Sequence, residues 1–267
     1  MRLRIVHSIV HHYEPPATGV IQVLRLTPRN HEGQYVIDWR IDVSADVRLN
    51  AHEDAFGNLT HVFSVDGLFE ELSVRVDGEV ETQNTDGVVR GTAERFPPRL
   101  FLRDTPLTLA DAPIRDFAQR VRAANGGDTL AELHLLLRHL HDAMTHENGQ
   151  SLPAPTAAEA FARKRGTARD LTHVFVGAAR SLDIPARYVT GYFCADGTSE
   201  GSAGHAWAEA FVSHLGWVGF DPSSGVCPTD AFVRVAIGLD ALGAAPVRGM
   251  RYGTGAETLA VAIRVDQ

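Results

Sequence analysis

The chain has 267 residues with a formal net charge of −8 at pH 7, and 44% of them are hydrophobic. This content is sufficient for one large core or two smaller ones. The negative charge argues against a nucleic-acid-binding protein, which needs a clustered basic face. The two cysteines, Cys194 and Cys227, argue against both a disulfide framework and a cysteine zinc site.

No segment approaches the uninterrupted apolar length of a membrane helix. The start of the chain alternates polar and apolar residues and lacks the cleavage site of a signal peptide. We therefore expect a cytoplasmic protein that does not bind a membrane.

The first hundred residues are predicted to form β-structure. Gly57-Asn58 is typical of a hairpin turn. Short strands joined by turns favour a sandwich or barrel-like domain over residues 1–100. Pro97-Pro98 and Pro106 mark a linker, after which residues 101–267 are predicted to form a second domain. The strands are expected in runs rich in Val and Ile, at residues 21–26, 35–44 and 71–81.

Three helices are predicted after the linker. Asp111 is a plausible N-cap of the first, with Pro113 in its first turn. Capping-box patterns predict that the second helix begins at Thr129-x-x-Glu132 and the third at Thr156-x-x-Glu159.

A fourth helix is predicted to begin within "GTARDLTHVF", residues 166–175. Its apolar residues recur at helical spacing from Leu171 to Leu182, which indicates a buried stripe, and Pro185 ends it. Strands follow at residues 186–193, 205–212 and 217–221. The second domain is thus expected to place helices before an antiparallel sheet, which makes the fold class α+β.

The start of the fourth helix is suited to a catalytic thiol. Unpaired N–H groups and the helix dipole lower the pKa of a thiol there and stabilise a developing oxyanion. Such a thiol needs a base, and the base needs an orienting acceptor. His205 begins one strand and Asp221 ends the next, so a hairpin would bring their ends side by side.

Three segments, "GTARDLTHVFVGAARSLDIPARYVTGYF", "GHAWAEAFV" and "GWVGFDPSSG", together resemble the core of transglutaminase-like cysteine enzymes of the papain-like superfamily. In that family the helix opens with Gly-x-Cys-x-Asp. The resemblance implies that His205 is the base, Asp221 the orienting carboxylate and position 168 the nucleophile, which here is Ala168. "LRLTPR" and "DAFGN" resemble the N-terminal domain of bacterial members, so the likeness extends over nearly the whole chain.

Two explanations account for Ala168. The nucleophile was replaced on purpose, giving an active-site mutant, or the protein is a naturally inactive relative that binds peptides. We expect the former, since a protein free of catalytic demand has no reason to keep the remaining residues of the site together.

Other residues have competing interpretations. Asp170 either orients substrate or stabilises the first helical turn, and Trp207 either walls the cleft or packs in the core. His173 is predicted to be structural, and Cys194 lacks the setting of a substitute nucleophile. The histidines at positions 134, 139, 141 and 146 do not have metal-ligand spacing.

The resemblance implies acyl transfer through a thioester on a peptide or protein substrate. We expect hydrolysis rather than cross-linking, because water is always present and nothing in the sequence identifies an amine site. No metal or organic cofactor is implied.

Overall fold

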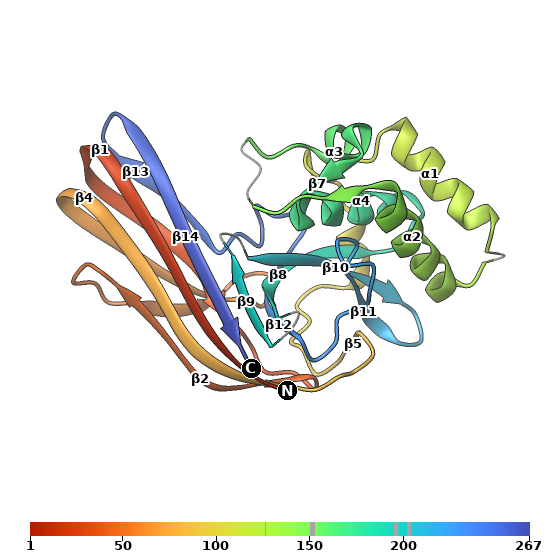
Figure 1. The fold of residues 1–267 in the computed structure, drawn as a ribbon, viewed down its shortest axis with the longest axis horizontal. Coiled ribbons are helices and arrows are strands. Elements are labelled where there is room, and N and C mark those ends of the chain that lie inside the picture. Colours follow the sequence, from red (N-terminus) through yellow and green to blue (C-terminus); the bar gives the residue numbers. More distant parts are fainter. Residues whose placement is uncertain (126, 150–152, 195–196, 202–203) are drawn as a thin grey trace.

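The computed structural model describes residues 1–125, 127–149, 153–194, 197–201 and 204–267. Over these residues the protein is an α+β fold in which a long curled sheet lies beside a layer of helices packed on a second sheet (Figure 1). This is the predicted fold class.

The larger sheet forms a half-barrel from long antiparallel strands. Its order is β2-β4-β1-β14-β9, with β13 also paired to β1 and β3 to β4. Its strands β1 and β4 are longer than the short runs expected from the sequence. The predicted turn at Gly57 is present, between β3 and β4. The bounds are β1 (Arg2–Thr27), β2 (Gln34–Val43), β3 (Asn50–Glu53), β4 (Leu59–Thr82), β9 (Thr198–Gly201), β13 (Val247–Tyr252) and β14 (Ala256–Asp266).

The larger sheet draws on both ends of the chain. β14 runs antiparallel to β1 from Arg4 opposite Asp266 to Glu14 opposite Ala256, so the two termini lie close together (Figure 1). The division at residue 100 stays a prediction. β9, β13 and β14, which come after residue 100, nevertheless belong to the same sheet as β1, β2 and β4.

The smaller sheet is also antiparallel, in the order β12-β8-β10-β11-β5. β5 comes from the N-terminal range and pairs with β11. The bounds are β5 (Val88–Val89), β8 (Ala186–Phe193), β10 (His205–Val212), β11 (Gly216–Phe220) and β12 (Phe232–Gly238).

Four α-helices lie in the described part of the chain. Asp111 and Thr156 cap α1 and α3 as predicted. The expected cap of α2 was wrong by one residue: Asp128, not Thr129, accepts the free N–H groups, because its carboxylate contacts the first turn. The bounds are α1 (Ala112–Ala123), α2 (Thr129–Ala143), α3 (Ala157–Arg163) and α4 (Ala168–Ser181), with a 3₁₀-helix η1 (Pro98–Leu102) and a two-stranded parallel pair, β6 (Thr145–His146) and β7 (Arg165–Gly166).

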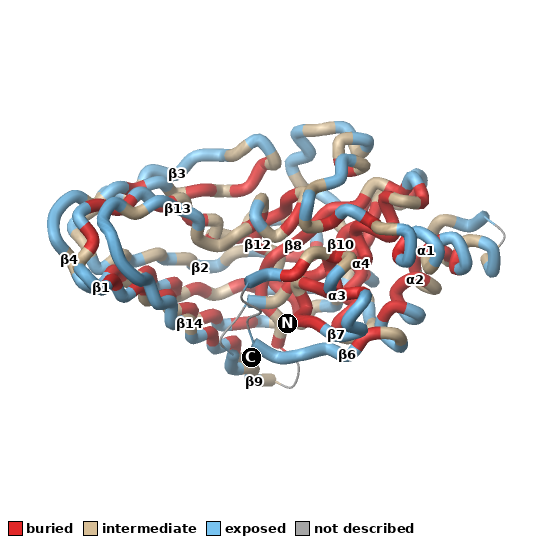
Figure 2. The backbone as a smooth tube through the Cα atoms, turned by 90° about the horizontal axis from the view of Figure 1, so that it is seen from above, coloured by how far each residue is buried: buried red, intermediate tan, exposed pale blue. Residues whose placement is uncertain are grey.

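α4 is the central helix of the second layer. Every one of its residues except Arg169 and Ser181 is buried, and it packs against β8 and β10. Figure 2 shows this region as the most continuously buried part of the chain. Its N-terminus is therefore held in one place relative to the strand that carries His205.

A buried ion network clamps the smaller sheet. Glu209 on β10 bonds Arg187 on β8 and Arg234 on β12, each at 2.6 Å. Arg187 also bonds Glu94, which ties the segment between β5 and η1 to the sheet. Burial opposes ionisation of Glu209, but the two arginines outweigh it and lower its pKa to about 2.

Glu209→Gln is expected to lower the free energy of unfolding by about 3–5 kcal/mol, because it leaves buried guanidinium groups without their shared counter-charge. The pKa of Glu209 is depressed in the folded state, so this difference is fully present above about pH 4.5 and shrinks as pH falls toward 2. Urea unfolding at several pH values measures it. Glu200→Gln on exposed β9 is the control, and equal stability of the two variants at pH 7 would contradict the expectation.

Candidate active site

The N-terminus of α4 is fixed by its own first turn. The carboxylate of Asp170 accepts hydrogen bonds from the N–H (3.0 Å) and Oγ1 (2.9 Å) of Thr167, the N-cap. Gly166 precedes this turn, where a Cβ would come within 2.7 Å of the Asp170 Cβ. Ala168, the first residue of the helix, lies between Thr167 and Asp170, so the hydrogen bonds between these two residues fix its position at the helix N-terminus.

His205 and Asp221 are brought together as predicted. β10 and β11 form an antiparallel hairpin, and Asp221 follows β11. The Nε2 atom of His205 lies 2.8 Å from Oδ2 of Asp221. The His205 side chain is 15% exposed and that of Asp221 is fully buried. The Nδ1 edge of the imidazole is therefore not engaged by this carboxylate.

Two serines also hold the Asp221 carboxylate. The N–H and Oγ of Ser223 donate to Oδ1, and Oγ of Ser224 donates to Oδ2. Burial alone would raise the pKa of Asp221, but the hydrogen bonds from His205 and the two serines outweigh it, so the pKa lies below its ordinary value. Asp221 is accordingly an ionised acceptor that keeps the ring of His205 in one orientation.

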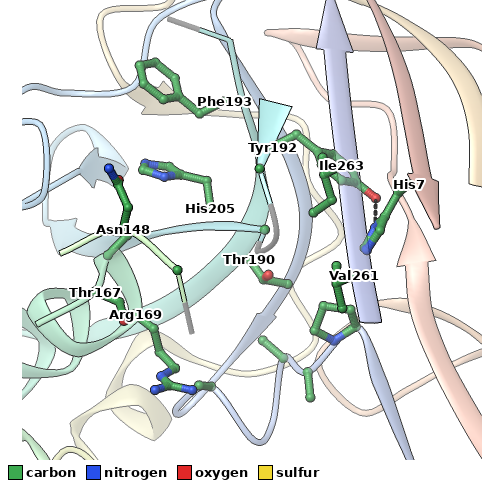
Figure 3. A pocket seen from close by; sticks show the side chains of 18 of the residues that line it. His7, Asn148, Thr167, Arg169, Thr190, Tyr192, Phe193, His205, Val261 and Ile263 are labelled. Atoms are coloured by element: carbon green, nitrogen blue, oxygen red, sulfur yellow. Dashed lines mark hydrogen bonds between the residues drawn. The ribbon is translucent and has the colours of Figure 1, made fainter. Parts of the chain in front are cut away.

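Ala168 and His205 open into one cavity of about 780 Å³. Thr167 and Arg169 lie at its α4 end, and Asn148 extends toward His205 (Figure 3). The opposite wall comes from β1 and β14 of the larger sheet, where Val261 and Ile263 are found. The site therefore lies between the two layers of the molecule, with each supplying part of its lining.

The remaining predicted residues lie away from this cavity lining. Asp170 is buried and turned into the first helical turn, which favours its helix-stabilising interpretation. Trp207 is 2% exposed and packs edge-to-face on Phe232, which favours core packing. His173 is fully buried, accepts from the Ala241 N–H through Nε2, and has its pKa lowered to about 4 by burial, in keeping with the structural role predicted.

Sequence reasoning missed the residues that support and surround the His205–Asp221 pair. Ser223 and Ser224 follow Asp221 in "DPSSG", where a turn-forming Asp-Pro-Ser was the available signal. His146 lines the cavity, and its pKa is lowered first by burial and then by the nearby charge of His205. The β1 and β14 wall could not be found locally, because it arises from pairing between the two ends of the chain.

The cysteines lie elsewhere. Cys194 is buried, and burial raises the pKa of Cys227 to about 11. Over the residues that the structure describes, no group of three or more His, Cys, Asp or Glu side chains could hold a metal ion. Within the same residues, no helix is both long and apolar enough to cross a membrane.

Comparison with known families agrees with this geometry. Residues 3–81 match the bacterial transglutaminase-like N-terminal region, and residues 115–222 match the transglutaminase-like superfamily. Residues 115–222 of the chain therefore form a core of the transglutaminase-like superfamily. The second match contains α4, His205 and Asp221, and the first contains most of the half-barrel.

Individual relatives span nearly the full length of this transglutaminase-like chain. An uncharacterized protein of Mycobacterium leprae (strain TN) is 27% identical, with 100% of this chain and 99% of the relative covered. The crystal structure of a candidate cysteine protease from Cytophaga hutchinsonii has a TM-score of 0.74 at 18% identity, over 98% of this chain and 90% of that one. The two therefore share a fold across both layers.

A further solved structure is a more distant likeness. It is the periplasmic domain of TgpA from Pseudomonas aeruginosa bound to ethylmercury, with a TM-score of 0.40 and 16% identity over 82% of this chain and 90% of that one.

Proposed function

We propose that this site is that of a cysteine peptidase or amidase acting on peptide or isopeptide bonds, with its nucleophile replaced at Ala168. The observation that supports it is that His205, hydrogen-bonded to Asp221, lines the same cavity as Ala168, the first residue of α4. His205 is the base, Asp221 orients it, and position 168 is where the nucleophile acts.

The reaction follows from these positions when position 168 is Cys. The thiol proton passes to His205 Nδ1, and the thiolate attacks the carbonyl carbon of the amide. The oxyanion is stabilised by N–H groups at the start of α4. The carbon–nitrogen bond then breaks, the leaving amine takes the proton from His205, and a thioester remains. Water activated by the same histidine hydrolyses the thioester and releases the acid and the free thiol.

With Ala168 the chain retains the cavity and the base but cannot form the thioester. It is therefore expected to bind a peptide or protein substrate without processing it. We also propose that the protein is located in the cytoplasm. The alternative is a naturally inactive peptide-binding module, which the methyl group at position 168 fits equally well. Restoring the nucleophile at position 168 distinguishes an inactivated enzyme from a naturally inactive binding module.

Ala168→Cys is expected to produce a thiol that iodoacetamide alkylates well below the usual thiol pKa of about 8.5, because the helix dipole and His205 favour the thiolate. The alkylation rate against pH, followed by mass spectrometry, measures it. Cys227 is an internal control, since its pKa is raised to about 11. His205→Gln in the same background should move the profile to higher pH. A new thiol that titrates like a free cysteine would refute the proposal.

A further inference from the structure

Two histidines on the wall opposite the proposed catalytic residues are not explained by that chemistry. His7 and His11 both lie on β1 and both line the cavity. They are 3% and 8% exposed, and the Nε2 atom of each is buried with no hydrogen-bond partner among the described residues. Buried polar groups nearly always have a partner, and both of these unpaired atoms belong to side chains that line one cavity, which makes this wall a candidate ligand surface.

The other nitrogen of each ring is already engaged. Nδ1 of His7 lies 3.1 Å from the hydroxyl of Tyr192 on β8, a contact visible in Figure 3, and Nδ1 of His11 lies 2.7 Å from Oε1 of Glu257 on β14. These bonds fix both rings. Nε2, the ring nitrogen farther from the strand, is then the atom each ring presents away from β1. Burial lowers the pKa of His7 to about 4, so this ring is neutral at physiological pH.

Between and beside the histidines the wall is apolar. Ile9 lies between them on β1, and the strand pairing sets Ile263 opposite His7 and Val261 opposite Ile9. Leu259 stands opposite His11 and is 47% exposed. The two histidines are four residues apart on one strand, a separation of about 13 Å. An extended peptide covers that distance in four residues and presents carbonyl oxygens at the same repeat.

We propose that the β1 and β14 wall binds an extended, uncharged peptide segment through its carbonyl oxygens and apolar side chains. The Tyr192 hydroxyl donates to Nδ1 of His7, and Nε2–H of His7 donates to a main-chain carbonyl of the peptide. The valine and isoleucine side chains contact its apolar residues. This inference deepens the proposed function by naming its substrate class, and it applies equally to a chain that binds without turnover.

The test uses the full chain with Ala168 and three pools of hexapeptides that carry the same N-terminal fluorophore and a C-terminal amide. The central four positions are apolar, basic or acidic in the respective pools, and fluorescence anisotropy gives an apparent Kd for each. The apolar pool is expected to bind at least about 10-fold more tightly than either charged pool. His7→Phe should weaken its binding by about 3- to 10-fold, the loss of one buried hydrogen bond.

His12→Phe is the matched control. It makes the same change on the same strand, on a side chain that is exposed and absent from the cavity lining, and it should leave the Kd unchanged. Leu259→Lys supplies a second test at a position exposed enough to accept it, even if His7→Phe fails to fold. It should weaken the apolar pool and tighten the acidic pool by about 10-fold.

Equal Kd values for His7→Phe and His12→Phe would overturn the proposal that the β1 and β14 wall binds the peptide. So would a charged pool that binds as tightly as the apolar one, a Leu259→Lys variant with unchanged preference, or no binding of any pool. None of these results bears on the alkylation profile of Ala168→Cys, which needs no peptide. The proposed peptide-binding wall and the proposed catalytic function can therefore be refuted independently of each other.

Discussion

Replacing Ala168 by Cys is expected to raise turnover of a peptide substrate by about six orders of magnitude, the loss measured when a serine protease is deprived of its nucleophile. The reason is that the cavity, His205 and the helix N-terminus are already in place, and only the group that forms the covalent bond is missing. Products from a peptide library, quantified by mass spectrometry with each protein, measure the gain.

Ala168→Ser is the control for that gain. It introduces a nucleophile of similar size whose proton is much harder to remove, so it should remain far below Ala168→Cys. Turnover by Ala168→Cys no higher than that of the chain with Ala168, under conditions where both bind the library, would favour the naturally inactive binding module.

Asp221→Ala in the Ala168→Cys background is expected to lower turnover by about four orders of magnitude, with little change in peptide affinity. Asp221 holds Nε2 of His205 at 2.8 Å and is itself held by two serines, so its removal frees the ring and withdraws the charge that stabilises the imidazolium. Steady-state kinetics should show the loss in kcat rather than in KM. Asp142→Ala, an exposed change on α2, should have no effect. A loss of less than tenfold for Asp221→Ala would mean that this carboxylate does not orient the base.

The local features of the site could be predicted because short-range patterns encode them. The apolar spacing from Leu171 to Leu182 placed α4, and its start followed from "GTARD". The hairpin of β10 and β11 brought His205 to Asp221 because the strands were separated only by a tight turn. Each of these contacts depends on residues near one another in sequence.

The opposite wall depends on contacts that no local pattern specifies. β14 pairs with β1 across almost the entire length of the chain, and only that pairing sets Ile263 beside His7 on one face. The environment of Trp207 could not be predicted either. Its position two residues after His205 is compatible both with a cleft wall and with core packing. The side to which the ring turns was decided by packing against Phe232.

The most direct test of the cysteine-enzyme assignment is the intact mass of Ala168→Cys after incubation with a peptide library and quenching in acid. We expect the mass of Ala168→Cys to rise by the mass of the peptide minus its leaving amine, through a thioester that digestion locates on the fragment containing position 168, and no such rise for the chain with Ala168. Retention of the same peptides by both proteins, with no adduct and no product after prolonged incubation, would contradict it.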